Sequence, residues 1–169
     1  TYTGNGSAGR TVSHSLGSTP GMVIVKKTSA TGLWATLHKD ANLMYLERTN
    51  GQYSASSTAA MFGDGTNVVR PTASVFTVGA GDNVNTSGQT YVAYLFASDA
   101  GGFGEDGDES IIKCGIYNGD DSAKQTINLG WEAQWVLIKK ITSASSWVLV
   151  DVMRGMVIPD GSNNDPSLF

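Results

Sequence analysis

The stretch Val23-Ile24-Val25-Lys26-Lys27 decides the fold of this chain, because its pattern returns 113 positions later as Val136-Leu137-Ile138-Lys139-Lys140. A β-branched and aliphatic run without polar alternation predicts a strand that is covered on both faces. Trp34 returns at the same distance as Trp147, and a connection of small residues precedes each tryptophan. Each copy therefore predicts a β-hairpin. A tryptophan at the same place in two diverged copies is expected to anchor the core.

The similarity continues outward from the two hairpins. Tyr2-Thr3-Gly4-Asn5-Gly6 is echoed 115 positions later by Tyr117-Asn118-Gly119-Asp120-Asp121, and Leu16-Gly17 by Leu129-Gly130 after 113. The difference indicates that a turn has lost two residues. We interpret the chain as one module present about one and a half times. Because it lacks an initiator Met and starts and stops inside its own repeat, we expect it to be an excerpt of a longer protein.

The strand and domain boundaries follow from Gly, Ser, Asn and Asp clusters. The first module is predicted at residues 1–98, a Gly/Asp-rich linker at 99–109, and the start of a second module at 110–169. The first strand of that second part could complete the sheet of the first module, because sheet edges are covered where the chain permits. Strands are predicted at Arg10–Ser15, Met22–Lys27, Leu33–His38, Leu43–Glu47, Ser74–Val78, Thr90–Ala97, Ser110–Tyr117, Lys124–Asn128, Gln134–Ile141 and Ser146–Val152.

The composition is typical of an all-β protein. Charged residues make up 15% of the chain, 21 residues are Gly, and helical periodicity is almost absent. We predict an antiparallel β-sandwich of the jelly-roll or lectin-like kind, as a tandem repeat with an incomplete second copy.

Charge and cysteine content exclude several classes of protein. The net charge of −4 gives nucleic acid no basic surface, and no apolar stretch approaches the ~20 residues needed for membrane insertion. The Lys-Lys pairs are predicted to be solvated strand ends. Cys114 is the only cysteine, so no internal disulfide can form, and a buried thiol is expected.

Catalytic motifs are weak. Gly4–Gly9 matches the dinucleotide-binding pattern G-x-G-x-x-G, but a strand-like segment follows it where the mechanism needs a helix, so it predicts a turn. His14 and His38 are expected to be exposed polar residues at strand ends rather than members of a hydrolase triad. We predict no catalytic residue and no cofactor; a polysaccharide-degrading enzyme ranks last because no facing pair of carboxylates is visible.

The acidic loops are candidate Ca²⁺ sites. Asp106, Asp108 and Glu109 bring carboxylates together around a glycine, and hard oxygen ligands suit this ion. Asp160–Asp165 is a weaker second candidate.

Aromatic residues provide candidate binding surfaces. Trp131, Trp135, Tyr45, Tyr53 and Phe103 could hold a sugar beside polar side chains, or form an interface with another module or subunit. The sequence leaves both alternatives open.

Two blocks resemble a known family. Gly130–Lys140, with Trp147–Asp151 and Met153–Gly155 after it, resembles a domain of unknown function that recurs in structural proteins of tailed, often marine, bacteriophages. Ser74–Gly79, Asn83–Asn85 and Gly88–Phe96 resemble the closing half of the same domain.

The resemblance implies a non-enzymatic virion component, such as a tail fibre, a host-attachment or a decoration protein. Its partners would be other virion proteins and copies of itself, with a trimer favoured. The alternative is a lectin-like module that binds a host surface glycan. The first copy departs from the pattern, since His38-Lys39 replaces Asp151 and the Arg-Gly that follows.

Overall fold

The computed structural model describes residues 1–120 and 125–153. The chain divides into two compact units: Thr1–Arg48 with Gln52–Ile116, and Thr49–Gly51 with Tyr117–Phe169. The first unit therefore contains residues 99–109, which the sequence assigned to a linker, and residues 110–116, which it assigned to the second module.

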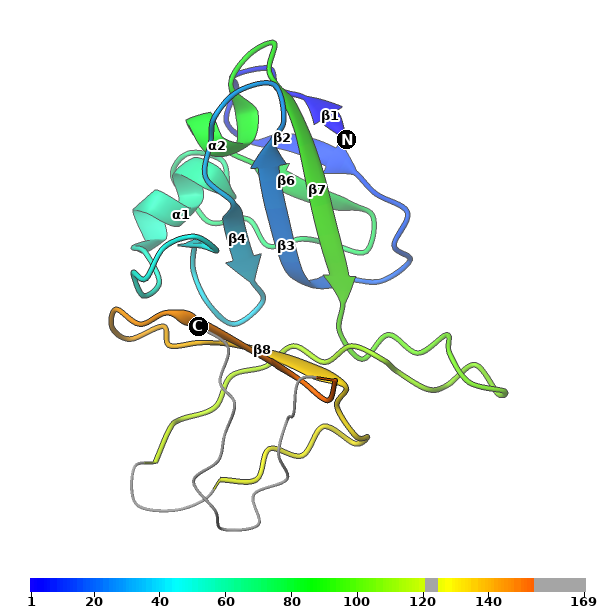
Figure 1. The fold of residues 1–169 in the computed structure, drawn as a ribbon. Coiled ribbons are helices and arrows are strands. Elements are labelled where there is room, and N and C mark those ends of the chain that lie inside the picture. Colours follow the sequence, from blue (N-terminus) through cyan, green and yellow to red (C-terminus); the bar gives the residue numbers. More distant parts are fainter. Residues whose placement is uncertain (121–124, 154–169) are drawn as a thin grey trace. The chain divides into compact units, whose positions relative to one another are not determined.

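The first unit is built on a five-stranded antiparallel sheet with the order β1 (Tyr2–Thr3), β7 (Thr90–Ala97), β3 (Pro20–Lys27), β4 (Ala35–His38) and β5 (Met44–Tyr45) (Figure 1). The central strand is β3, which pairs with β7 along one edge and β4 along the other. The uninterrupted apolar run reflects this central position. The predicted hairpin formed by β3 and β4 is confirmed, as are the bounds of Thr90–Ala97.

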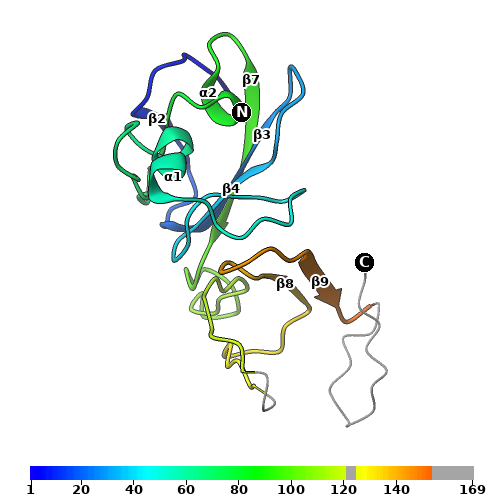
Figure 2. The same ribbon diagram turned by 90° about the vertical axis from the view of Figure 1, so that its left-hand side faces the viewer.

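A second layer covers one face of this sheet. It contains β2 (Arg10–Ser13), which pairs with β6 (Val75–Val78), and the helices α1 (Ala55–Met61) and α2 (Asp82–Asn85). Figure 2 shows α1, α2 and β2 on the same side of β3 and β7. Strands predominate, as predicted. Two short helices and a two-stranded sheet, however, stand where a sandwich has its second large sheet.

Alternate residues of the sheet fill the space between the layers. Side chains on a strand point to opposite faces in turn, so Val23 and Val25 share the inner face of β3. The buried cluster consists of Val23, Val25, Ala35, Leu37, Leu43, Tyr45, Phe62, Phe76, Val78, Val84 and Tyr91. Each fully buried Val, Leu or Phe side chain of this cluster contributes about 1.5–3 kcal/mol relative to an exposed one.

The N-terminal segment is fastened to this core. The Tyr2 ring stacks on Tyr91 at 5.2 Å between centroids, and its hydroxyl donates to the Val84 carbonyl at 2.5 Å. Two residues later, Gly4 passes so close to Thr86 that a Cβ at Gly4 would overlap the Thr86 carbonyl oxygen. The Tyr-x-Gly element is therefore a packing feature.

The α1 helix was not expected from the sequence. Ser54 caps its N-terminus, because the Ser54 hydroxyl accepts the Ser57 amide proton at 3.2 Å. The Ala-rich run after this cap is a helix signal, and a search for β-branched and aromatic runs does not detect it. Within the residues described, no helix has the length and apolar character to cross a membrane.

The second unit contains a hairpin of β8 (Trp135–Lys139) and β9 (Trp147–Asp151). The predicted strands Ser110–Tyr117 and Lys124–Asn128 are absent where the structure describes them, and Lys124 lies outside the described residues. No described residue of this unit is buried. An isolated hairpin cannot bury either of its faces, which explains this exposure.

Candidate binding surface and polar network

The outer face of the large sheet carries an aromatic pair. Ile24 and Tyr94 are paired residues on β3 and β7, and the Trp34 ring stacks on Tyr94 with centroids 6.2 Å apart and planes at 25°. Tyr94 is 46% exposed and Trp34 is half-buried. Trp34 lies outside the buried cluster, so its prediction as a core anchor was wrong. Its position just before β4 places it on the outer face rather than the inner one.

Charged groups surround this pair. The Lys26 ammonium lies 5.8 Å from the Trp34 ring centroid and donates to the Gly32 carbonyl at 2.7 Å. The Glu47 carboxylate accepts the Trp34 backbone N–H at 3.1 and 3.2 Å. We name Lys26, Trp34 and Tyr94 the outer-face aromatic site. Its rings can pack on a flat apolar surface, while the amine is a hydrogen-bond donor beside them.

Two predicted ligand residues lie in or against the core. Tyr45 is 6% exposed, and its ring meets that of Tyr53 edge-on at 5.3 Å. Burial raises the pKa of the Tyr45 hydroxyl. The prediction of Tyr45 as an exposed ligand platform was therefore wrong, since its ring fills the inner face of β5. Tyr53 packs against the buried cluster.

The other predicted aromatics are more accessible. Trp131 is half-buried in the second unit, where Trp135 is 52% exposed. In the first unit, Phe103 is 47% exposed and forms a bridge with Glu109, with backbone hydrogen bonds of 3.2 and 3.0 Å. Phe103 lines a mostly apolar depression of about 270 Å³ together with Leu95 and Ile111.

The acidic loop is solvated. Asp106, Asp108 and Glu109 are exposed, and within residues 1–120 and 125–153 no three acidic, His or Cys side chains are grouped to hold a metal ion. The calcium site stays a prediction. A melting temperature that rises with Ca²⁺ and falls with a chelator would support it, because an ion that binds only the folded state stabilises it. The second candidate, Asp160–Asp165, lies outside the described residues.

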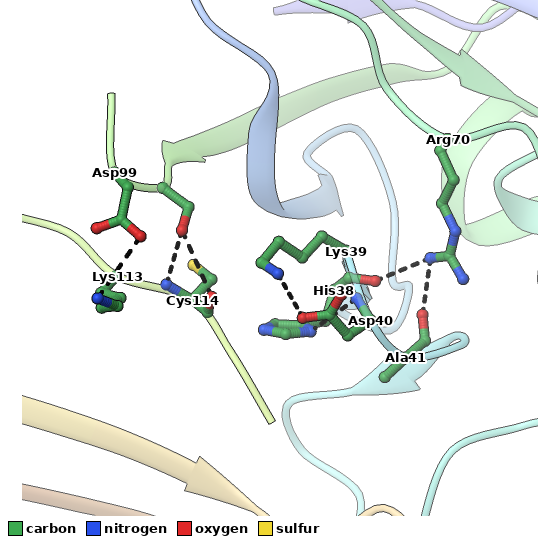
Figure 3. A network of polar contacts seen from close by, with 9 residues as sticks. His38, Lys39, Asp40, Ala41, Arg70, Asp99, Lys113 and Cys114 are labelled. Carbon is green, nitrogen blue, oxygen red and sulfur yellow. Dashed lines mark hydrogen bonds and ion pairs between the residues drawn. The ribbon is translucent and has the colours of Figure 1, made fainter. Parts of the chain in front are cut away.

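A polar network surrounds the turn after β4 (Figure 3). The Arg70 guanidinium donates to the carbonyls of His38 and Ala41, each at 2.8 Å, and so fixes both ends of the turn. The Asp40 backbone N–H donates to His38 Nδ1 at 3.1 Å, and the Lys39 ammonium pairs with the Asp40 carboxylate at 2.6 Å. Burial lowers the pKa of His38, which favours a neutral imidazole.

Cys114 belongs to the same region. Its backbone N–H donates to the Ser98 hydroxyl at 3.0 Å, and its side chain packs on Gly21, where a Cβ would lie 2.9 Å from the sulfur. Burial raises the pKa of the Cys114 thiol, which keeps it protonated, whereas a nucleophilic cysteine needs a lowered value. The contacts support a packing role for Cys114 at the start of β3.

His14 is held by backbone groups after β2. Its Nδ1 accepts the Leu16 N–H at 3.3 Å, and its Nε2 lies 3.2 Å from the Thr72 carbonyl. A neutral ring that accepts at Nδ1 carries its proton at Nε2, so Nε2 donates to Thr72. The ring therefore ties β2 to the segment before β6.

Lys27 corrects the expectation of solvated strand ends. Its side chain is 9% exposed, with the ammonium 5.9 Å from the Tyr91 ring centroid and 3.4 Å from the Thr86 hydroxyl. The preceding lysine, Lys26, reaches the turn on the opposite face. Strand alternation thus separates the two amines of the pair.

A family described as a domain of unknown function, DUF7483, matches residues 1–164. No curated protein sequence matches the chain, and no solved structure does.

Proposed function

Because the chain belongs to the DUF7483 family, we propose that it is a non-enzymatic structural protein built from repeated modules, of the tail-fibre or decoration type carried by bacteriophage particles. The virion setting rests on the sequence resemblance. The observation that carries the modular part is the geometry of the two hairpins.

The two hairpins have the same register. In the first unit the pairs run from Met22↔His38 to Val25↔Ala35. In the second they run from Trp135↔Asp151 to Ile138↔Val148. Moving every residue of the first set by 113 positions gives the second set. A one-residue slip would have sent every side chain to the other face, so the agreement supports a duplication.

A side-chain contact supports the same interpretation. The Lys26 ammonium donates to the Gly32 carbonyl at 2.7 Å. The Lys139 ammonium donates to the Ser145 carbonyl, also at 2.7 Å. Both members of the second pair lie 113 positions after their counterparts. Each lysine therefore fixes the connection of its own hairpin, although Gly32 and Ser145 differ in sequence.

Repetition of this kind suits a structural role. Modules that each carry an incomplete core bury apolar surface against their neighbours, which produces elongated assemblies. Homo-oligomers, with the trimer favoured, would extend the same principle across chains.

The assembly state tests this proposal. Sedimentation velocity of the chain over a range of concentrations, with electron microscopy of the product, should show a defined homo-oligomer or elongated particle. A clean monomer at high concentration would contradict it. Release of reducing ends from host polysaccharide would instead favour an enzyme.

A second candidate is carbohydrate binding, and the outer-face aromatic site favours it. Stacked rings with an adjacent amine match the apolar face and the hydroxyls of a sugar ring. A glycan array of host surface sugars should show binding that Tyr94→Ala abolishes. Tyr117→Ala, which removes a tyrosine that is 49% exposed elsewhere, serves as the matched control. Equal binding by both variants would exclude this site.

A further inference from the structure

The strand β7 completes the first unit, and the second hairpin has no equivalent of it in the described residues. In the first unit β7 lies between β1 and β3 and pairs with both. Within residues 1–120 and 125–153, β8 pairs with β9 alone. The hairpin that corresponds to β3 and β4 thus offers one sheet edge that its counterpart has filled.

The backbone of β3 shows which groups β7 uses. The Thr28 amide donates to the Thr90 carbonyl at 2.9 Å. Because backbone groups alternate between the two edges of an antiparallel strand, every second residue faces β7. These residues are Met22, Ile24 and Lys26, each of which is paired with a β7 residue.

The same reasoning locates the open groups of β8. The Val152 amide donates to the Gln134 carbonyl at 3.0 Å, so this pair is directly hydrogen-bonded. Alternation then directs the backbone groups of Trp135, Leu137 and Lys139 away from β9. These are the counterparts of Met22, Ile24 and Lys26, 113 positions on.

Side-chain exposure points to the same missing strand. Tyr2 pairs with Tyr91 of β7 and stacks on its ring, whereas the corresponding Tyr117 is 49% exposed. Val23 is 1% exposed in β3, whereas the corresponding Val136 is only partly covered. Tyr117 is therefore open where β7 covers Tyr2 in the first copy, and Val136 is partly open where the second layer covers Val23.

We propose that the open edge of β8 binds a strand of the β7 type, which inserts antiparallel beside Trp135–Lys139 and completes the second module. Its occupant has the alternation of Thr90–Ala97, with Tyr91, Ala93 and Leu95 on one face. Main-chain hydrogen bonds provide affinity, and the alternating side chains provide register. This inference rests on the modular part of the proposed function.

A synthetic peptide with the sequence of residues 89–98 tests the inference on the full chain. Amide exchange and chemical shifts, followed by NMR, should report the peptide at β8. We expect the peptide to slow the exchange of the Trp135, Leu137 and Lys139 amides by a factor of about ten or more, since each amide gains a hydrogen bond. The Tyr117 signals should shift with them.

Two matched controls distinguish strand insertion from nonspecific binding of the peptide. A peptide with Tyr94→Pro lacks an amide that faces β3 in the first unit, so it should not protect β8. In the protein, Leu137→Pro removes one outward amide and leaves the hydrogen bonds to β9 in place, and it should also abolish protection.

Three outcomes would overturn the inference. The first is no change at β8 with saturating peptide. The second is protection of the β8 amides before peptide is added. Such protection rises with protein concentration if a second copy pairs with the β8 edge, and it is independent of concentration if another part of the same chain pairs with it. The third is a change of the NMR signals of Met22 and Ile24 alone, which would mean that the peptide replaces β7 beside β3 in the first unit. The first and third outcomes leave the assembly state untouched, so sedimentation tests the structural proposal separately from them.

Discussion

Asn85 is the residue that joins the N-terminal loop to the second layer. It is fully buried, and its Nδ2 donates to the carbonyls of Ser7 and Gly79 at 2.8 and 2.9 Å. Its Oδ1 accepts the Asn5 backbone N–H at 3.0 Å. A single amide thus satisfies three backbone groups from two segments, in an interior where unpaired groups are costly.

Asn85→Ala should lower the free energy of unfolding by roughly 2–4 kcal/mol, because it leaves several backbone groups without a hydrogen-bond partner. Asn85→Asp should also destabilise, since a carboxylate has no N–H for Ser7 and Gly79. Chemical denaturation measures both. Asn67→Ala, at an exposed position, is the control and should stay within about 0.5 kcal/mol of wild type.

His38 makes stability depend on pH. Burial lowers its pKa in the folded state, opposed by Asp40 and assisted by the nearby cations Lys39 and Arg70. The unfolded chain therefore takes up a proton first, and stability falls as the pH drops below about 6.5. Above that pH the contribution is fully present. His38→Gln should flatten this part of the curve of unfolding free energy against pH, and identical curves would contradict the assignment.

At the scale of elements, α1 depends on its cap. Ser54→Ala should cost about 1 kcal/mol, because the Ser57 amide loses its acceptor at the helix start. Thermal unfolding followed by circular dichroism measures the change. Ser56→Ala, two residues further along the chain, keeps the bond between Ser54 and the Ser57 amide and is the matched control. Equal effects of the two substitutions would remove the cap from the explanation.

The hairpins could be predicted from the sequence and the second layer could not. The continuous apolar runs that begin at Val23 and Val136 predicted strands, and both are strands. The further expectation of cover on both faces suits β3, which is central in its sheet, whereas β8 pairs with β9 alone in the described residues. In contrast, α1 is a short helix whose sequence signal lies in one serine cap and a few alanines. Segment 110–116 has strand-like composition, yet it packs by single contacts such as Cys114 on Gly21. Whether such a segment forms a strand depends on its pairing partner, which composition does not identify.

The candidate site shows the same limit. Trp34 was recognised as special because it recurs, but recurrence does not tell which face of a strand a side chain occupies. The neighbour that makes the site, Tyr94, lies 60 positions away and becomes adjacent only through the pairing of β3 with β7. Tyr45 and Tyr53 are the opposite case. Their residue type suits a binding surface, but Tyr45 belongs to the buried cluster and Tyr53 packs against it.

At the scale of the whole molecule, stability is concentrated in the first unit. All members of the buried apolar cluster belong to it, and no described residue of the second unit is buried. The fragment 1–116 should therefore unfold cooperatively at close to the temperature of the full chain, whereas 117–169 alone should show no cooperative transition. Calorimetry of the two fragments checks this. A cooperative transition in 117–169 would mean that the second unit has a core of its own.

The crowding of Gly4 against the Thr86 carbonyl has a use beyond this chain. Where the backbone leaves no room for even a methyl group, substitution is disfavoured in every copy that folds the same way. Gly119 occupies the matching place in the sequence, but an added Cβ there would meet nothing within 4 Å, so the crowding belongs to the first copy. The two copies share a sequence pattern: a tyrosine, any residue and a glycine, followed some 20 residues on by an aliphatic run that ends in paired lysines. This pattern, with its steric basis at Gly4, is a signature with which further copies can be located in longer proteins.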